Sequence, residues 1–157
     1  MLARGLATAV VVALLDQLSK VAVLAFFAGR PLGDREMLTS FFNLALTYNR
    51  GISFGFFNGG AGLNALVFSV TAAAIVAVLI YWLSRAASSF LSVAIGLIIG
   101  GAVGNVIDRL RLGAVVDFLD VHLGPLHWPA FNLADSAICI GVAAMLLESL
   151  LLRREAH

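Results

Sequence analysis

Long apolar runs separated by polar segments dominate the pattern of this sequence. Four runs, at residues 5–28, 63–83, 89–108 and 133–152, each approach the ~20 residues that a helix needs to cross a bilayer. Residues 84–88 form a tight turn between the second and third runs, whereas 29–62 and 109–132 are long connections. The pattern predicts a single membrane domain over residues 1–157, with four spans and both long connections on the same side.

The arginines indicate which side of the membrane holds the termini. The side with both termini has short, arginine-dense segments, whereas the opposite side has slightly more arginines spread over long connections. The positive-inside rule weights short segments near span ends, so we expect cytoplasmic termini and periplasmic connections. The arginines on the side of the termini are Arg4, Arg85, Arg153 and Arg154. Those on the opposite side are Arg30, Arg35, Arg50, Arg109 and Arg111.

The two long connections differ in pattern. Apolar and polar side chains alternate over 42–49, which is typical of a strand, and 52–56 resumes the alternation after turn chemistry at 49–51. We predict a hairpin that turns at 49–51 and lies on the membrane, with an aromatic face toward lipid or substrate. In 109–132 an apolar run surrounds Asp117, and Pro125 and Pro129 interrupt any long helix.

These patterns together predict the fold class. It is an all-α integral membrane bundle of four transmembrane helices, with a small extracytoplasmic β-hairpin or sheet and a short periplasmic helix or loop. Composition agrees, because 61% of the 157 residues are hydrophobic and 12% are charged, against about 25% charged in soluble domains. The net charge of +1 argues against a nucleic-acid partner.

The single cysteine and the first span exclude two other classes of chain. Cys139 allows no internal disulfide and no multi-thiolate metal site, and its apolar surroundings indicate a small packing residue. The first run is too long for the apolar part of a signal peptide and contains Asp16, Gln17 and Lys20. We therefore expect an uncleaved first helix.

A stripe of small residues marks the third span. Gly96, Gly100 and Gly104 share one helical face, and Gly101 widens it, so a neighbouring helix can approach closely. The stripe could pack within one chain or between two, and we expect a monomer. Close packing would fix the polar residues that follow on this helix, which are Asn105, Asp108 and Arg109.

Asp117 and Asp135 are the strongest candidates for chemistry. Each is surrounded by apolar residues beside a span, where an acidic residue is a functional hypothesis by default. Two carboxyls that lie close together share a proton, so one can activate water while the other protonates a peptide carbonyl. The topology permits the two to meet, and we predict an aspartyl hydrolase at a membrane surface that needs no metal or cofactor.

Other charged residues have simpler interpretations beside functional ones. Asp16 and Lys20 share a helical face, so they could form an ion pair that eases insertion or a polar contact for the site. Arg109 could bind a carboxylate or a lipid phosphate, or lock Asp108. We expect ordinary loop charge at Asp34, Arg35, Glu36 and Asp120, and an interfacial histidine at His127 beside Trp128.

Three alternatives compete with the hydrolase. A small proton-coupled transporter could use Asp16, Lys20 and Asp135 as a relay, although no inverted repeat is present. A non-enzymatic assembly factor could be held together by the glycine stripe. Ser53 lies in a Gly-x-Ser-x-Gly pattern, but that motif requires an α/β sheet, which a four-helix membrane protein does not supply.

The ordered motifs resemble those of bacterial lipoprotein signal peptidase, also called signal peptidase II. The resemblance covers nearly the whole length of the chain. The motifs are Asp16-Gln17-x-x-Lys20, Asn49-x-Gly51, Gly100-Gly101-x-x-Gly104-Asn105-x-x-Asp108-Arg109, Val116-Asp117-Phe118 and Phe131-Asn132-x-Ala134-Asp135.

The resemblance implies a specific activity. Members remove the signal peptide of diacylglyceryl-modified prolipoproteins by cutting just before the lipidated cysteine, near the outer face of the cytoplasmic membrane. Asp117 and Asp135 would be the catalytic pair, and connection 29–62 would match a small sheet that cradles the substrate. The positions implied to shape or stabilise the site are Asp16, Lys20, Asn49, Asn105, Asp108, Arg109 and Asn132.

Overall fold

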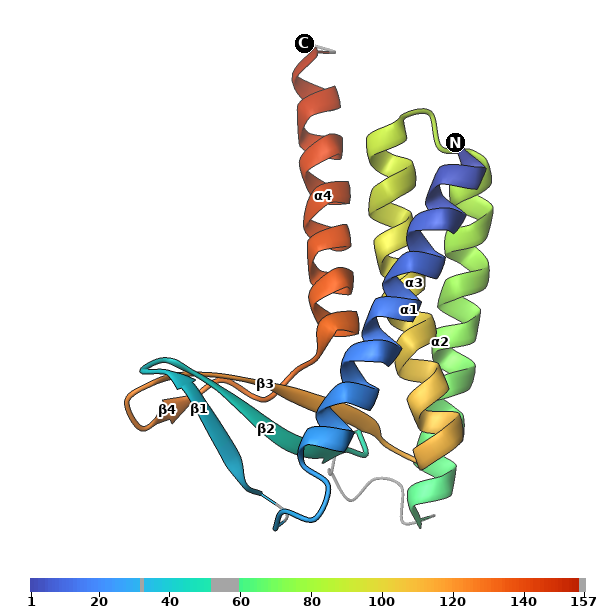
Figure 1. Ribbon diagram of the computed structural model, residues 1–157. Coiled ribbons are helices and arrows are strands. Elements are labelled where there is room, and N and C mark those ends of the chain that lie inside the picture. The colour runs from blue at the N-terminus through green and yellow to red at the C-terminus, as the bar shows by residue number, and fades with distance from the viewer. Residues whose placement is uncertain (32, 52–59, 156–157) are drawn as a thin grey trace.

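Four long helices form an up-and-down bundle in the computed structural model, which describes residues 1–31, 33–51 and 60–155 (Figure 1). They are α1 (Leu2–Phe26), α2 (Gly60–Ser84), α3 (Ser89–Leu112) and α4 (Leu133–Glu155). All four contain a stretch long and apolar enough to cross a membrane, which confirms the predicted helices. Both chain ends lie at one end of the bundle (Figure 1). Cys139 is exposed on α4, so its predicted packing role is wrong.

Helix α3 is the central helix and packs against α1, α2 and α4. Its glycines permit close approach: a Cβ at Gly100 would lie 2.6 Å from the carbonyl oxygen of Ala9. A Cβ at Gly104 would lie 2.5 Å from a carboxylate oxygen of Asp16. Gly101 faces the backbone of α4 in the same way. The glycine stripe therefore packs within one chain.

A four-stranded antiparallel sheet lies at the end of the bundle away from the termini (Figure 1). Its strands are β1 (Arg35–Thr39), β2 (Phe42–Asn49), β3 (Val115–Leu123) and β4 (Leu126–His127), in the spatial order β1-β2-β3-β4. The strand predicted at 42–49 is confirmed. At the turn predicted over 49–51 the chain bends, because Gly51 has a φ of 88° and its amide donates to Oδ1 of Asn49 at 2.9 Å. The hairpin that the structure describes joins β2 to β1, across a turn that follows Thr39. The predicted second strand, 52–56, lies outside the described residues.

The second long connection forms strands instead of the predicted short helix or loop. Its apolar residues pair with β2, so that Asp117 lies opposite Thr47 and Asp120 lies opposite Asn43. Gly124, with a left-handed φ of 57°, belongs to the turn between β3 and β4. Pairing with a strand distant in the sequence decides this structure, and the local pattern of residues does not specify that partner.

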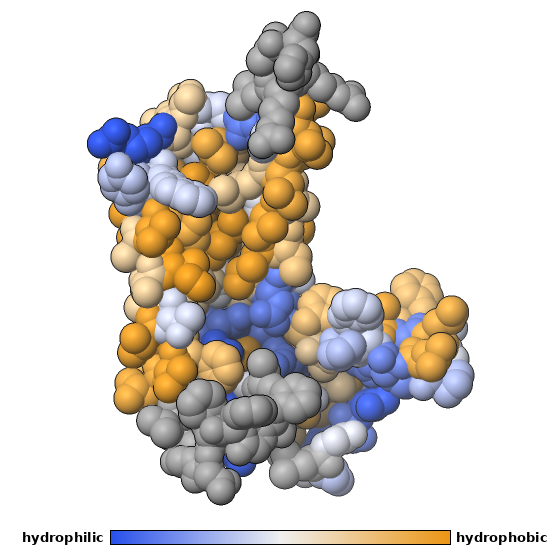
Figure 2. Space-filling model, turned by 180° about the vertical axis from the view of Figure 1, so that it is seen from behind, coloured by the Kyte–Doolittle hydropathy of each residue, from blue (hydrophilic) through white to orange (hydrophobic). Residues whose placement is uncertain are grey.

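The two faces of β3 have different surroundings. Val116 and Phe118 pack with Val23 and Phe27 at the end of α1. Successive side chains of a strand point to opposite faces, so Asp117 belongs to the other face. The sheet projects sideways from the bundle beneath α4 (Figure 1), and Figure 2 shows polar residues gathered in the corner between sheet and helices.

Candidate active site

A buried lysine lies between two buried acids where α1 meets α3. Nζ of Lys20 is 2.8 Å from Oδ2 of Asp16 and 2.8 Å from Oδ2 of Asp108, and it donates to Oδ1 of Asn105 at 3.1 Å. The exposed fractions of Lys20 and Asp16 are 2% and 0%. The ion pair considered for the first span is confirmed and includes a second acid. Such charges are tolerated in a nonpolar interior only when paired, so the cluster fixes the register of α1 against α3.

Both acids of this cluster also accept a hydrogen bond from a distant backbone amide. Oδ1 of Asp16 accepts from the amide of Ala134 at 3.0 Å. Oδ2 of Asp108 accepts from the amide of Val116 at 3.0 Å. Each of these amides belongs to the residue that directly precedes one of the two candidate aspartates. The buried charges therefore position the backbone that carries both of them.

Asparagine side chains join Asp117 of β3 to Asp135 of α4. Nδ2 of Asn132 donates to Oδ1 of Asp117 at 2.7 Å, and its backbone amide donates to Oδ2 of Asp135 at 3.3 Å. Nδ2 of Asn105 donates to Oδ1 of Asp135 at 2.8 Å. Asn132 also caps α4, because its Oδ1 accepts from the amide of Asp135 at 2.9 Å. The two predicted aspartates are therefore brought to one place.

Asp117 has an environment suited to proton transfer. Asp117 is 1% exposed, and Nδ2 of Asn49 donates to Oδ2 of Asp117 at 3.0 Å. Burial raises the pKa of Asp117 to about 6, and the charge of Asp135 acts in the same direction. Hydrogen bonds from Asn49 and Asn132 and the charge of Lys20 oppose the rise. A carboxyl poised between its two protonation states near neutral pH is typical of acid–base sites.

Arg109 lies beside this pair on the last turns of α3. Its guanidinium carbon is 5.3 Å from the centre of the Phe68 ring, and Nη1 donates to the carbonyl oxygen of Asn105 at 3.4 Å. Within the described ranges, the ion-pair partner of Asp108 is Lys20 and not Arg109. The alternative in which Arg109 locks Asp108 is therefore not supported.

Asp120 is a residue whose importance the sequence did not reveal. It is 3% exposed, which shows that the expectation of ordinary loop charge is wrong. Asn43 donates to its Oδ2 at 3.0 Å, Nδ1 of His127 lies 2.7 Å from its Oδ1, and Nη1 of Arg35 lies 3.5 Å from its Oδ2. These three partners come from β2, β4 and β1. One carboxylate of β3 thus joins all four strands.

Electrostatics explains why Asp120 stays charged in a buried position. Burial alone would raise the pKa of Asp120, but the hydrogen bonds from Asn43 and His127 outweigh it. The charge of Arg35 adds to them, so the pKa lies below its ordinary value.

Two further expectations concern groups outside this pair. No cluster of three or more His, Cys, Asp or Glu side chains that could hold a metal ion occurs in the part of the chain that the structure describes. Ser53, in the Gly-x-Ser-x-Gly pattern, lies outside the described residues.

Comparisons with known proteins indicate the family of the chain. The signal peptidase (SPase) II family model matches residues 8–151. Lipoprotein signal peptidases of Burkholderia cenocepacia and Paraburkholderia phymatum are 49% and 47% identical over 150 residues, covering 95% of this chain and 89% of each relative. Two solved structures described as bacterial membrane enzymes, determined by the in meso method at 2.3 and 1.9 Å, give TM-scores of 0.75 and 0.79 at 32% identity. Each match covers 93% of this chain, and 87% and 92% of theirs.

Proposed function

The chain belongs to the signal peptidase II family, and from this premise we propose that Asp117 and Asp135 form the catalytic pair of an aspartyl endopeptidase. The protein is a multi-pass bacterial membrane protease that removes the signal peptide from prolipoproteins. Its substrates carry a diacylglyceryl group on the cysteine, and the cut falls just before that residue. The observation that supports the pair most directly is that both carboxylates accept hydrogen bonds from Asn132.

The mechanism divides two roles between the carboxyls. We assign the shared proton to Asp117, because burial and the charge of Asp135 raise its pKa and so favour its protonated form. Asp135 serves as the base and removes a proton from water while the water oxygen attacks the scissile carbonyl carbon. Asp117 donates its proton to the carbonyl oxygen, which gives a neutral diol. Collapse of the diol breaks the C–N bond: the proton held by Asp135 goes to the leaving amine, and a hydroxyl proton of the diol returns to Asp117, which gives a carboxylic acid and restores the pair.

The surrounding polar residues hold this pair in place. Asn132 and Asn105 orient the carboxylates by the hydrogen bonds described above, and Asn49 stabilises the ionised form of Asp117. Arg109 lies within electrostatic reach of both aspartates and can stabilise the negative charge that the pair carries. The buried charges that position the flanking backbone are Asp16, Lys20 and Asp108.

We place the site near the periplasmic face of the cytoplasmic membrane, with both termini in the cytoplasm. Asp117 belongs to β3 and Asp135 to the first turn of α4. The sheet lies at one end of the bundle, and the chain ends lie at the other (Figure 1). A diacylated cysteine keeps its acyl chains in the outer leaflet, so the adjacent peptide bond reaches interfacial depth, where water is available. A single chain contains the whole site, and its glycine stripe is already occupied by α1, so a monomer suffices.

The transporter alternative has less support. Lys20 is engaged by two acids and an asparagine, which leaves it closed within the α1–α3 contact. Figure 2 also shows polar residues gathered in the corner between the sheet and the helices. A lysine held in this way and polar residues beside the sheet suit a site at the sheet end of the bundle better than a relay that uses Lys20.

Release of the signal peptide from a diacylglyceryl-modified prolipoprotein by purified protein tests the proposal. We expect Asp117→Asn and Asp135→Asn each to lower the rate by roughly 10³-fold or more, whereas Asp34→Asn, a change at an exposed loop acid, keeps the wild-type rate. Near-normal turnover by either variant of the pair would refute the assignment. A chelator should have no effect, and proton movement without cleavage would favour the transporter.

A further inference from the structure

Gln17 of α1 bridges the two acids that surround the buried Lys20. Its Nε2 donates to Oδ1 of Asp108 at 2.9 Å and to Oδ2 of Asp16 at 3.2 Å. The carbonyl oxygen of Gly104 lies 3.2 Å from the same nitrogen. The ammonium group of Lys20 joins the same two acids. Asp16 and Asp108 are therefore held together twice, by a charged donor and by a neutral amide.

The lysine alone does not balance the charge of this cluster. When both acids are ionised, Asp16 and Asp108 supply two negative charges against one positive charge on Lys20. Gln17 brings a second positive charge to them, because Nη1 of Arg111 on α3 donates to Oε1 of Gln17 at 3.3 Å. The amide thus accepts from a cation on one side and donates to anions on the other. Hydrogen bonds arranged in such a chain strengthen one another.

Arg109, the other arginine in the last turn of α3, acts mainly on the proposed catalytic pair. Both members of that pair have a larger electrostatic effect on Arg109 than Asp108 has. Helix positions two apart do not face each other. Accordingly, Arg109 lies against Phe68 of α2, whereas Arg111 reaches Gln17 of α1. The two arginines therefore serve different groups of acids.

The cluster acts on the proposed catalytic pair through two backbone amides. Asp16 accepts from the amide of the residue before Asp135. Asp108 accepts from the amide of the residue before Asp117. The distance between the two buried acids therefore sets how far apart these backbone segments lie, and Gln17 joins the acids directly. In the described part of the chain Gln17 makes no hydrogen bond with either member of the pair, so its effect passes through the cluster.

We propose that Gln17, coupled to Arg111, is a positioning residue that sets the separation of the two proposed catalytic carboxyls. The proposal rests on the function proposed above. Gln17 supplies the neutral donor that keeps the two buried acids together, and Arg111 orients the amide so that Nε2 points toward them. A change in either residue should move the carboxyls from the distance at which they share a proton and a water molecule. Such a change lowers kcat more than it raises KM, because neither side chain acts on the substrate directly.

Steady-state cleavage of a diacylglyceryl-modified prolipoprotein tests the proposal, with kcat expressed per folded protein. Gln17→Leu removes both ends of the amide at similar volume and should lower kcat by roughly 10- to 100-fold, with KM within about 2-fold. Arg111→Leu leaves the amide in place and should lower kcat by roughly 3- to 10-fold. Arg111→Lys keeps a positive charge and a donor, so its kcat should stay within about 2-fold of wild type.

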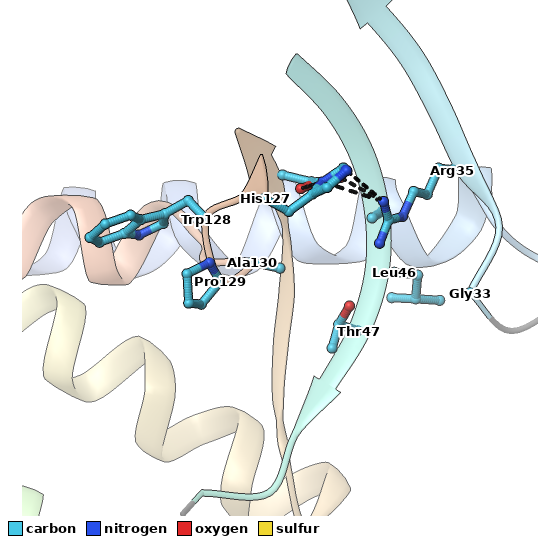
Figure 3. A pocket seen from close by; sticks show the side chains of 10 residues that line it. Gly33, Arg35, Leu46, Thr47, His127, Trp128, Pro129 and Ala130 are labelled. Atoms are coloured by element: carbon cyan, nitrogen blue, oxygen red, sulfur yellow. Dashed lines mark hydrogen bonds and ion pairs between the residues drawn. The ribbon is translucent and has the colours of Figure 1, made fainter. Parts of the chain in front are cut away.

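The double variant tests whether Arg111 acts through Gln17. Once Gln17→Leu has removed the acceptor, Arg111→Leu should lower kcat further by less than about 2-fold, because coupled residues have non-additive effects. Arg35 provides a matched control, since it is an exposed arginine whose Nη1 lies 3.5 Å from a carboxylate oxygen of the buried Asp120, next to His127 (Figure 3). Its contacts belong to the sheet, so Arg35→Leu should change kcat by the same factor in wild type and in Gln17→Leu.

Wild-type kcat in Gln17→Leu, an effect confined to KM, or full multiplication of the two losses in the double variant would overturn the proposal. If Gln17→Leu does not fold, the exposed Arg111 still decides the question. Equal kcat values in wild type, Arg111→Leu and Arg111→Lys would then overturn the proposal. Failure of the proposed function would look different, since Asp117→Asn would then still cleave the substrate.

Discussion

The hydrogen bond from Asn49 to Asp117 should set the pH range of cleavage. Asn49→Ala removes a 3.0 Å contact that favours the ionised carboxylate, so the pKa of Asp117 should rise above about 6. Hydrogen bonds to charged groups contribute about 1.5–3 kcal/mol, and Asn49 is exposed, so about 1 kcal/mol is a reasonable share. With 1.36 kcal/mol per pKa unit, this corresponds to roughly 0.7 pH unit.

The direction of the change follows from the role of the proton. Asp117 must be protonated in the proposed mechanism, so kcat/KM should fall as pH rises through its pKa. A higher pKa moves this falling limb to higher pH, by about 0.5–1 pH unit in Asn49→Ala. Initial rates of signal-peptide release at low substrate concentration, measured from about pH 4.5 to 8, report this limb for the free enzyme.

Asn43 provides a matched control on the same strand. Its Nδ2 donates to a carboxylate oxygen of Asp120 at 3.0 Å, as Asn49 donates to Asp117 at the same distance. Asn43→Ala should lower the rate without moving the limb, because Asp120 takes no part in proton transfer. The reasoning would be refuted if the falling limb of kcat/KM stayed in place or moved to lower pH in Asn49→Ala. It would also be refuted if the limb moved equally in both variants.

Three further predictions concern stability, each measured by thermal unfolding in detergent. Lys20→Met leaves two buried carboxylates without their cation and should lower stability by about 3–5 kcal/mol. The control Arg30→Met breaks an exposed ion pair and should lower stability by less than about 1 kcal/mol. Similar losses in the two variants would contradict the stabilising role of the buried cluster. Gly104→Leu should lower stability by at least about 1–3 kcal/mol, since even its Cβ meets a carboxylate oxygen of α1; a neutral result would show that α3 does not pack there. Asp120→Asn should be less stable than wild type at neutral pH. Because folding lowers the pKa of Asp120, its carboxylate stabilises the fold above its ordinary pKa of about 3.9. This stabilisation is lost as the pH falls through the pKa of Asp120 in the folded protein. If the stability difference between wild type and Asp120→Asn were equal at about pH 3 and pH 7, the charge of Asp120 would not be its cause.

The sequence contains enough information to predict the helices and to propose the aspartate pair. Apolar runs predict helices because lipid imposes one length and one composition on every span. Asp117 and Asp135 could be selected as candidates because a carboxylate among apolar residues is rare without a role. The ion pair of Asp16 and Lys20 followed from helical spacing alone.

The sheet was harder to predict because it depends on distant pairing. Residues 115–123 look like an irregular loop until β2 supplies a partner, and only that pairing buries Asp120. The apolar residues on both sides of Asp117 were the available signal, since a strand buried on both faces reads as a continuous run. The bridge by Asn132 could not be foreseen either, because it depends on how α4 meets the end of β3.

The pairing of Asp16 with Lys20 has a consequence for biosynthesis. Helix α1 leaves the ribosome long before Asp108 is synthesised, so it must enter the bilayer without its later partner. Because the carboxylate of Asp16 and the amine of Lys20 are one helical turn apart, they form an ion pair and that part of the nascent α1 has no net charge. The helix can therefore stay in the bilayer before α3 is made. Helix α3 then brings a second acid to the same ammonium group, which couples its docking to the order of translation.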